Sequence, residues 1–207
     1  TVTWSPDEKY IYISLLNREQ NHLRLNQYDA HSGTLIKTLF EEQRDTYVEP
    51  QHPLYFLSGD PNHFLWWSQR DGYMHLYRCT TDGDIDTLMH GNWIVNDILG
   101  YNPKTSELIY TGTEDSPLQK NVYAIHLNKL TTRCLSATHA THTAQLSASG
   151  HYLLDVYSNE NIPRQIDVVK VADAKASRLF TAPNPLQDYQ LADVRLVTLK
   201  AADGTPL

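Results

Sequence analysis

Histidines and carboxylates are the residue types in this sequence that could do acid–base or metal chemistry together. The ten histidines are scattered, and His139-Ala-Thr-His142 is the one close pair. This pair falls in a polar loop, where solvated side chains are a better interpretation than a metal site. The adjacent residues Glu41-Glu42 and Glu114-Asp115 would point to opposite faces of a strand, so neither pair suits shared acid–base work. We expect solvated loop charge at both.

Recognisable catalytic motifs are missing from the chain. It contains no G-x-S-x-G nucleophile elbow, no H-E-x-x-H, no P-loop and no G-x-G-x-x-G. Cys79 and Cys134 fit no C-x-x-C pattern. A disulfide between them would need their Cα atoms within about 7 Å, so we expect two reduced, partly buried thiols instead. We therefore expect no catalytic residue, no metal and no cofactor in this chain.

Four segments of the chain share one order of strands and turns. The later segments recur every 44 residues, which fits the roughly 40–50 residues of a four-stranded propeller blade. The segments begin with the strands Tyr10–Leu15, Phe64–Trp67, Leu108–Thr111 and Tyr152–Tyr157. Shorter strands are expected before three of them, at Val2–Trp4, Asp97–Tyr101 and Thr143–Leu146. The turns Trp4-Ser-Pro-Asp and Leu146-Ser-Ala-Ser-Gly150 predict the same hairpin twice.

The residue pattern predicts an all-β chain. Thirteen tyrosines favour strands, and residues 73–79 alternate with period 2. We predict one partial β-propeller domain over 1–207, with about four consecutive four-stranded antiparallel blades; the alternative is a β-sandwich. The blades are expected at about 1–45, 62–92, 96–138 and 142–182, with a last strand within 183–207. Residues 39–45 and 172–179 could each form about two helical turns.

Charge and hydropathy exclude some classes of protein. The net charge is −7 at pH 7, which disfavours nucleic-acid binding because phosphate contacts need clustered Lys and Arg. No run of 18 apolar residues exists, so we expect no membrane span. The chain begins at Thr1 without Met or a signal peptide, and we expect it to be cut from a longer protein. The terminal segments are as apolar as the inner ones, so self-association is expected.

The first interval is longer than the others because of the stretch 41–60. Its residues 41–53 read Glu-Glu-Gln-Arg-Asp-Thr-Tyr-Val-Glu-Pro-Gln-His-Pro. Long loops between blades often carry function, although a solvated charged insertion is an equal alternative.

Four pieces of the sequence, in order, resemble a known family. They are Leu16-Asn-Arg-Glu-Gln-Asn21, Tyr28-Asp-Ala-His-Ser-Gly33, Trp67-Ser-Gln-Arg-Asp-Gly-Tyr-Met-His-Leu-Tyr77 and His90-Gly-Asn-Trp-Ile-Val95. Together they are similar to the N-terminal β-propeller of the dipeptidyl peptidase IV family, bacterial branch. Ala202-Asp-Gly-Thr-Pro206 resembles the start of the segment that leads into that family's α/β-hydrolase domain.

The resemblance implies a division of labour. The family's propeller is eight-bladed, so this chain resembles its C-terminal half, and the catalytic Ser, Asp and His would lie in an absent α/β-hydrolase domain. The family's paired substrate-binding glutamates lie in an earlier blade, so Glu41-Glu42 do not correspond to them. Tyr47-Val-Glu-Pro-Gln-His52 stands where the family has a loop that reaches the substrate. The mammalian aromatic residue and Arg of that loop are not matched, which leaves Glu49, Gln51 and His52 as substrate-binding candidates.

The function implied for the longer protein is that of a serine exopeptidase. It would release N-terminal dipeptides with penultimate Pro or Ala from oligopeptides, in the periplasm or another extracytoplasmic space. The propeller would gate access and help to shape the substrate site, while acyl transfer takes place in the hydrolase domain. The alternatives are a non-enzymatic propeller that serves as a binding scaffold and a propeller glycosidase.

Overall fold

The computed structural model describes residues 1–136, 139–192 and 197–205. Within these ranges the chain forms sixteen strands in four antiparallel sheets and no helix. Sheet 1 contains β1 (Val2–Trp4), β2 (Tyr10–Leu16), β3 (His22–Asp29) and β4 (Leu35–Gln43). Sheet 2 contains β5 (Tyr55–Phe56), β6 (His63–Ser68), β7 (His75–Thr80) and β8 (Ile85–Thr87). Sheet 3 contains β9 (Val95–Asn102), β10 (Glu107–Gly112), β11 (Asn121–His126) and β12 (Thr131–Cys134). Sheet 4 contains β13 (Thr141–Leu146), β14 (Tyr152–Asn159), β15 (Ile162–Lys170) and β16 (Lys175–Thr181).

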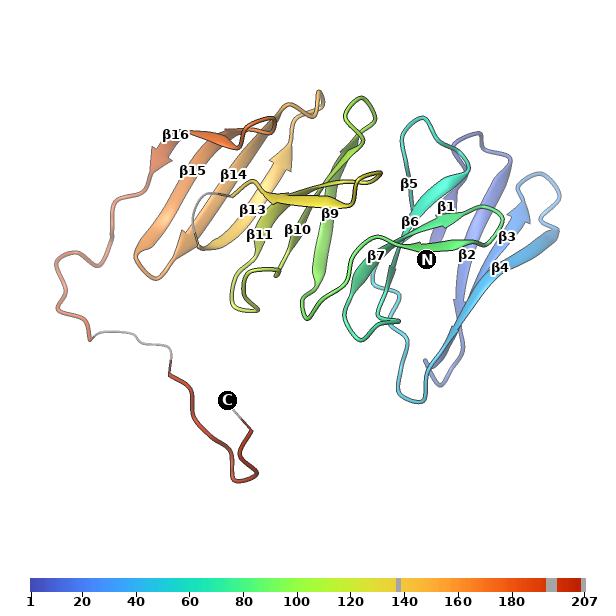
Figure 1. Ribbon diagram of the computed structural model, residues 1–207, viewed down its shortest axis with the longest axis horizontal. Helices are drawn as coiled ribbons and strands as arrows, with labels where there is room; N and C mark the ends of the chain where they lie inside the picture. Colours follow the sequence, from blue (N-terminus) through green and yellow to red (C-terminus); the bar gives the residue numbers. More distant parts are fainter. Residues whose placement is uncertain (137–138, 193–196, 206–207) are drawn as a thin grey trace.

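The four sheets lie side by side in chain order, and residues 183–192 and 197–205 lie away from them (Figure 1). Each sheet pairs its four strands in simple sequential order. The predicted first long strand of each repeat is the second strand of its sheet in all four cases. Four consecutive four-stranded antiparallel sheets packed face to face are the arrangement of propeller blades, so the predicted fold is confirmed.

The first hairpin of sheet 1 and that of sheet 4 have the same geometry. The hydroxyl of Ser5 accepts a hydrogen bond from the Tyr10 backbone N–H at 3.0 Å, and Ser147 accepts one from Tyr152 at 3.1 Å. Three residues after each serine the backbone enters the left-handed region, with φ of 59° at Glu8 and 71° at Gly150. Glycine adopts this conformation without strain. The serine shared by the two turns follows from this geometry, whereas the left-handed position is Glu in the first turn and Gly in the second.

Three apolar cores hold the sheets together, one between each neighbouring pair. Strand β6 contributes side chains to two of these cores, because successive side chains of a strand point to opposite faces. Phe64 and Trp66 pack in the core with sheet 1, and Leu65 and Trp67 pack in the core with sheet 3. The third core joins sheets 3 and 4 through residues that include Ile109. An inner sheet must therefore be apolar on both faces.

The structure corrects three local expectations. Residues 39–43 belong to strand β4 and residues 175–179 to β16, so neither predicted helical turn forms. In both places the antiparallel ladder with the neighbouring strand overrides weak helix propensity. The two-residue strand Tyr55–Phe56 is too short to show alternation, and no sequence pattern predicted it. The described residues of 183–205 contain no named strand, so the last strand expected there is not found; residues 193–196 and 206–207 lie outside the described ranges.

No helix that is long and apolar enough to cross a bilayer occurs in the described parts of the chain.

Candidate functional site

The two ends of the sheets differ in what they carry. We call loop end the end where β2–β3, β6–β7, β10–β11 and β14–β15 turn and where the chain passes from one sheet to the next; it is the lower end in Figure 1. The opposite end, with the other two hairpin turns of each sheet, is the hairpin end. Up-and-down pairing within each sheet makes the connection 44–54 part of the loop end.

Backbone contacts fix the connection 44–54 onto sheet 1. The Arg44 N–H donates to the carbonyl of Asn21 at 2.9 Å, and the Val48 N–H donates to that of Gln20 at 2.8 Å. The Val48 side chain is buried in the core between sheets 1 and 2. The Arg44 guanidinium donates to the carbonyl of Gln69 and so reaches sheet 2. The connection is thus a positioned loop, with a buried anchor in its middle.

The three substrate-binding candidates follow this anchor. Glu49 and Gln51 are exposed, and the Gln51 Nε2 donates to Glu49 Oε2 at 3.2 Å. The His52 ring stacks on Trp67, with 4.5 Å between ring centroids and 25° between planes. The cavity beside Glu49 holds only about 10 Å³, room for no more than a water molecule. The structure brings the three side chains onto one loop but gives them no peptide-sized pocket of their own.

The adjacent glutamates Glu41 and Glu42 have opposite environments. Glu42 has a side chain only 11% exposed. Its carboxylate accepts hydrogen bonds from Trp66 Nε1 at 2.9 Å, Ser68 Oγ at 3.0 Å and Arg70 at 2.8 Å. The expectation of solvated charge is therefore wrong for Glu42. It faces inward with Phe40 on β4, and extending the strand alternation past Phe40 could have found it.

Glu41 points to the other face, and its side chain is 47% exposed. It contacts His22 at 2.5 Å and Arg24 at 3.3 Å. The hydrogen bond with His22, followed by the charge of Arg24, lowers the pKa of Glu41. Such an exposed carboxylate contributes little to stability.

In the second carboxylate pair, the expectation of solvated loop charge is wrong for Glu114, which is half-buried, whereas Asp115 is exposed as expected. The Tyr110 hydroxyl donates to Glu114, and burial raises the pKa of this carboxyl above its ordinary value. Asp115 accepts from the Tyr123 hydroxyl at 3.0 Å and from Asn121 Nδ2 at 2.9 Å. The two tyrosines stack with 5.5 Å between centroids. Both acids thus accept hydrogen bonds from side chains of sheet 3, which spacing along the sequence could not indicate.

The predicted histidine pair is separated by the fold. His142 lies on β13, fully buried, with its Nδ1 2.8 Å from Asp155 Oδ2. His139 is exposed, and its Nδ1 lies 3.0 Å from Gln119 Oε1. The expected polar loop position is therefore wrong for His142. No group of three or more His, Cys, Asp or Glu side chains suited to a metal ion occurs in the described ranges.

The two cysteines also differ from one another. Cys79 is a buried free thiol, and burial raises its pKa to about 12. Cys134 is an exposed free thiol whose Sγ lies 3.3 Å from the carbonyl of Ser136. The expectation of partial burial is therefore wrong for both: one thiol is inert and one is accessible.

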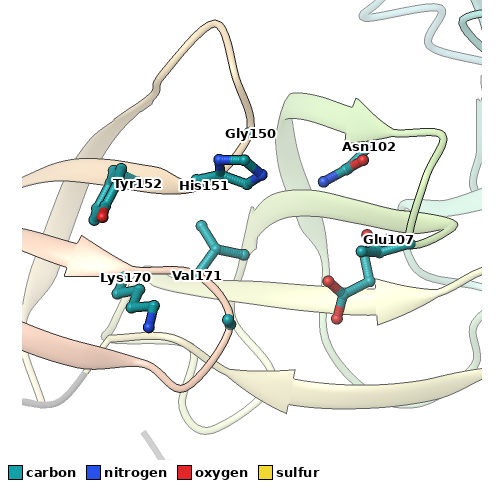
Figure 2. Close-up of a pocket in the computed structure, with 9 residues that line it drawn as sticks. Asn102, Glu107, Gly150, His151, Tyr152, Lys170 and Val171 are labelled. Atoms are coloured by element: carbon teal, nitrogen blue, oxygen red, sulfur yellow. The ribbon is translucent and has the colours of Figure 1, made fainter.

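At the hairpin end, a cavity of about 300 Å³ lies between sheets 3 and 4 (Figure 2). Figure 2 shows the His151 ring turned towards Asn102. Glu107, the one carboxylate in the lining, is already paired with Arg133 at 2.9 Å. Arg133 also donates to the carbonyl of Val171 at 2.6 Å and so ties sheet 3 to sheet 4. The cavity therefore offers no free carboxylate as a general base, and no sequence motif pointed to it.

Comparisons with known proteins agree in the family they indicate. The family model described as the dipeptidyl peptidase IV (DPP IV) N-terminal region matches residues 1–164. A "Probable dipeptidyl-aminopeptidase B" of Aspergillus oryzae is 26% identical over 231 residues, which cover 99% of this chain and 26% of the relative. A "Dipeptidyl peptidase 4" of Arthroderma otae is 28% identical over 148 residues, covering 68% of this chain and 19% of the relative. The chain thus spans about a quarter or less of the length of these relatives.

Two solved structures superpose on nearly the whole chain. A crystal structure from Bacteroides ovatus, titled a dipeptidyl aminopeptidase IV, matches with a TM-score of 0.91 and 38% identity. The match covers 100% of this chain and 32% of the Bacteroides ovatus chain. Porphyromonas gingivalis dipeptidyl peptidase 4 matches with a TM-score of 0.88 and 23% identity, over 99% of this chain and 29% of that one. At that identity the second likeness supports the fold alone.

Proposed function

Because this chain belongs to the dipeptidyl peptidase IV family, as part of its N-terminal region, we propose that it is a propeller portion of a longer serine exopeptidase. The likeness to the Bacteroides ovatus structure carries this proposal, since it extends over the whole chain at 38% identity. The longer protein releases N-terminal dipeptides with penultimate Pro or Ala from oligopeptides. Its catalytic residues lie outside this chain, which contains no G-x-S-x-G.

The loop end is the part of this chain that we assign to substrate access. A size filter above a hydrolase domain must admit a short amino-terminal segment and exclude a folded protein. Fixed loops can do this, and the connection 44–54 is fixed by backbone contacts and by buried Val48. Glu49, Gln51 and His52 then present polar groups that can contact a peptide backbone or amine. His52 is the best placed of the three, because its ring is oriented by Trp67.

Two further expectations belong to the same proposal. The longer protein acts in the periplasm or another extracytoplasmic space, and its activity needs no cofactor because acyl transfer uses a side-chain nucleophile. The absent α/β-hydrolase domain is the partner of this portion. A domain that contributes no catalytic residue affects turnover by orienting substrate rather than by proton transfer.

Chromogenic Gly-Pro and Ala-Pro dipeptide substrates test the proposal. The full-length protein should cleave both, and the isolated 207-residue chain should cleave neither. A folded full-length protein that is inactive on both would contradict the peptidase assignment. A full-length protein that binds a partner but hydrolyses neither substrate would favour the non-enzymatic binding scaffold instead.

The role of the loop is tested by His52→Ala in the full-length protein. We expect KM to rise roughly 3- to 10-fold with kcat nearly unchanged, because the ring contributes to binding and not to chemistry. His31→Ala is the matched control, since His31 is exposed on the β3–β4 turn at the hairpin end. Equal effects of the two substitutions would contradict the assignment of the loop end.

A further inference from the structure

The cavity at the hairpin end between sheets 3 and 4 has the size of a small-ligand site. It holds about 300 Å³, which is the lower limit for pockets that bind small molecules in proteins. Asn102 and Glu107 line it from sheet 3, and His151 and Lys170 line it from sheet 4. Each wall therefore belongs to a four-stranded sheet, and the packing of these two sheets determines the shape of the cavity.

The middle of the cavity is apolar. Figure 2 shows Val171 between the labelled polar side chains. Val171 is only 5% exposed and belongs to the core between sheets 3 and 4. Gly150 adds no side chain to the lining, and a Cβ at this position would lie 3.4 Å from Asn102 Nδ2. A ligand in the cavity therefore contacts apolar surface at its centre and polar groups at its ends.

The two walls carry opposite charges. Figure 2 shows Glu107 and Lys170 on opposite sides of Val171. Glu107 is the first residue of β10 in sheet 3, and Lys170 is the last residue of β15 in sheet 4. A negative wall and a positive wall with apolar surface between them complement a small molecule that carries an ammonium group at one end and a carboxylate at the other.

Both charged groups keep atoms that can bind a ligand. Arg133 donates through two nitrogens to the same oxygen of Glu107, Oε1, at 3.2 and 2.9 Å. Within the described residues, Oε2 of Glu107 accepts no hydrogen bond. The Lys170 ammonium lies 3.8 Å from Asp173 Oδ2, beyond hydrogen-bond distance. The two ion pairs lower the net charge of the cavity, but each leaves a polar atom that can contact a ligand.

Asn102 and His151 add uncharged polar groups to the lining. The Asn102 Oδ1 accepts from the Lys104 backbone N–H at 3.0 Å, which leaves its Nδ2 as the donor that can reach a ligand. Figure 2 shows the His151 ring turned towards Asn102. An amide and an imidazole can both form hydrogen bonds with a peptide group, so they suit the uncharged middle of a short peptide.

We propose that this cavity binds a short zwitterionic peptide of dipeptide size, with its ammonium group at Glu107 and its carboxylate at Lys170. The opposite charges of the two walls carry the inference. The choice of a dipeptide rests on the proposed function, because the longer protein would release such molecules. The cavity and the substrate-binding candidates of the connection 44–54 lie at opposite ends of the sheets.

Calorimetric titration of the full-length protein with Gly-Gly at low ionic strength tests this site. Gly-Gly carries the two charges of every dipeptide but lacks the Pro or Ala of the proposed products. Acetyl-Gly-Gly and Gly-Gly-amide each lack one of the charges. Lys170→Ala removes the cation of the site. Lys175→Ala is the matched control, because Lys175 is exposed and pairs with Lys170 across β15 and β16 but does not line the cavity.

We expect Gly-Gly to bind the parent protein and Lys175→Ala with the same Kd, and to bind Lys170→Ala roughly 3- to 10-fold more weakly. Each capped dipeptide should bind the parent protein more weakly than Gly-Gly by a similar factor. Gly-Gly should also raise the Tm of the parent protein more than that of Lys170→Ala, because a ligand that binds only the folded state stabilises it. Circular dichroism establishes that both variants keep the parent fold.

Three results would overturn the proposal. They are an equal Kd for Lys170→Ala and Lys175→Ala, a capped dipeptide that binds as tightly as Gly-Gly, and no binding of Gly-Gly at millimolar concentration. None of these measurements depends on hydrolysis. A failure of the peptidase assignment is detected separately, with the chromogenic substrates.

Discussion

Replacing Glu42 by alanine should destabilise the protein much more than replacing its neighbour Glu41. The Glu42 carboxylate is 11% exposed and accepts hydrogen bonds from Trp66, Ser68 and Arg70. The Glu42→Ala substitution leaves the indole N–H, the hydroxyl and the guanidinium without their acceptor. Arg70 also lies with its guanidinium carbon 4.5 Å from the Tyr77 ring centroid, a position that holds the cation near the core.

The size of the effect follows from what each donor loses. An unpaired buried donor costs about 1–3 kcal/mol, and breaking a buried ion pair costs roughly 3–5 kcal/mol. Arg70 is 30% exposed and regains some hydration, so we place the loss in unfolding free energy at about 3 kcal/mol. For a chain of this size, each kcal/mol lowers Tm by roughly 2–4 °C. The expected decrease in Tm is therefore roughly 6–12 °C.

Thermal unfolding followed by circular dichroism measures the effect, with Glu41→Ala as the matched control. The Glu41 side chain is 47% exposed and its ion pairs are at the surface, so Tm should stay within experimental error. Glu42→Gln keeps the shape and one acceptor oxygen and should give an intermediate Tm. Equal decreases for Glu41→Ala and Glu42→Ala would refute the assignment of Glu42 as a buried acceptor.

Two other predictions concern titratable groups. Alkylation without reductant should modify Cys134 quickly under native conditions and Cys79 only after unfolding, because Cys79 is buried with a pKa raised to about 12. Mass spectrometry measures the modification. If neither thiol is modified after unfolding, both are oxidised and the prediction is wrong. Burial raises the pKa of Glu114, so the folded state binds more protons than the unfolded state and stability falls as pH rises through that raised pKa. Glu114→Gln removes this loss, so its Tm relative to the parent should increase between about pH 4 and pH 7; parallel Tm curves for the two proteins would contradict the cause given for the shift.

The fold class and the order of the sheets could be predicted from the sequence alone. Alternation with period 2 and recurrence every 44 residues are both present in the order of the residues. The alternation follows from strand geometry, and the recurrence follows from the length of a four-stranded sheet. The strands Tyr10–Leu15 and Tyr152–Tyr157 were predicted as equivalent, and both are the second strand of their sheet. The ordered motifs also indicated the family, which the match over residues 1–164 bears out.

Which polar residues are buried depends on how the sheets pack against one another. Glu42 and Glu41 are neighbours of the same type, and what separates them is the presence of Trp66 and Arg70 from another sheet. His142 was expected in a loop, but pairing of β13 with β14 brings it beside Asp155 in the interior. Alternation along β4 indicates which face Glu42 lies on, but whether that face is buried depends on residues that are distant in sequence.

The same reason limits what the sequence could say about the candidate site. It located the connection 44–54 by length and composition. The anchoring by Val48 follows from the packing of sheets 1 and 2, and the stacking of His52 depends on the position of Trp67 in sheet 2. Strand periodicity determines which face a side chain lies on. The sheet that packs against that face determines whether the side chain is solvated, paired or buried.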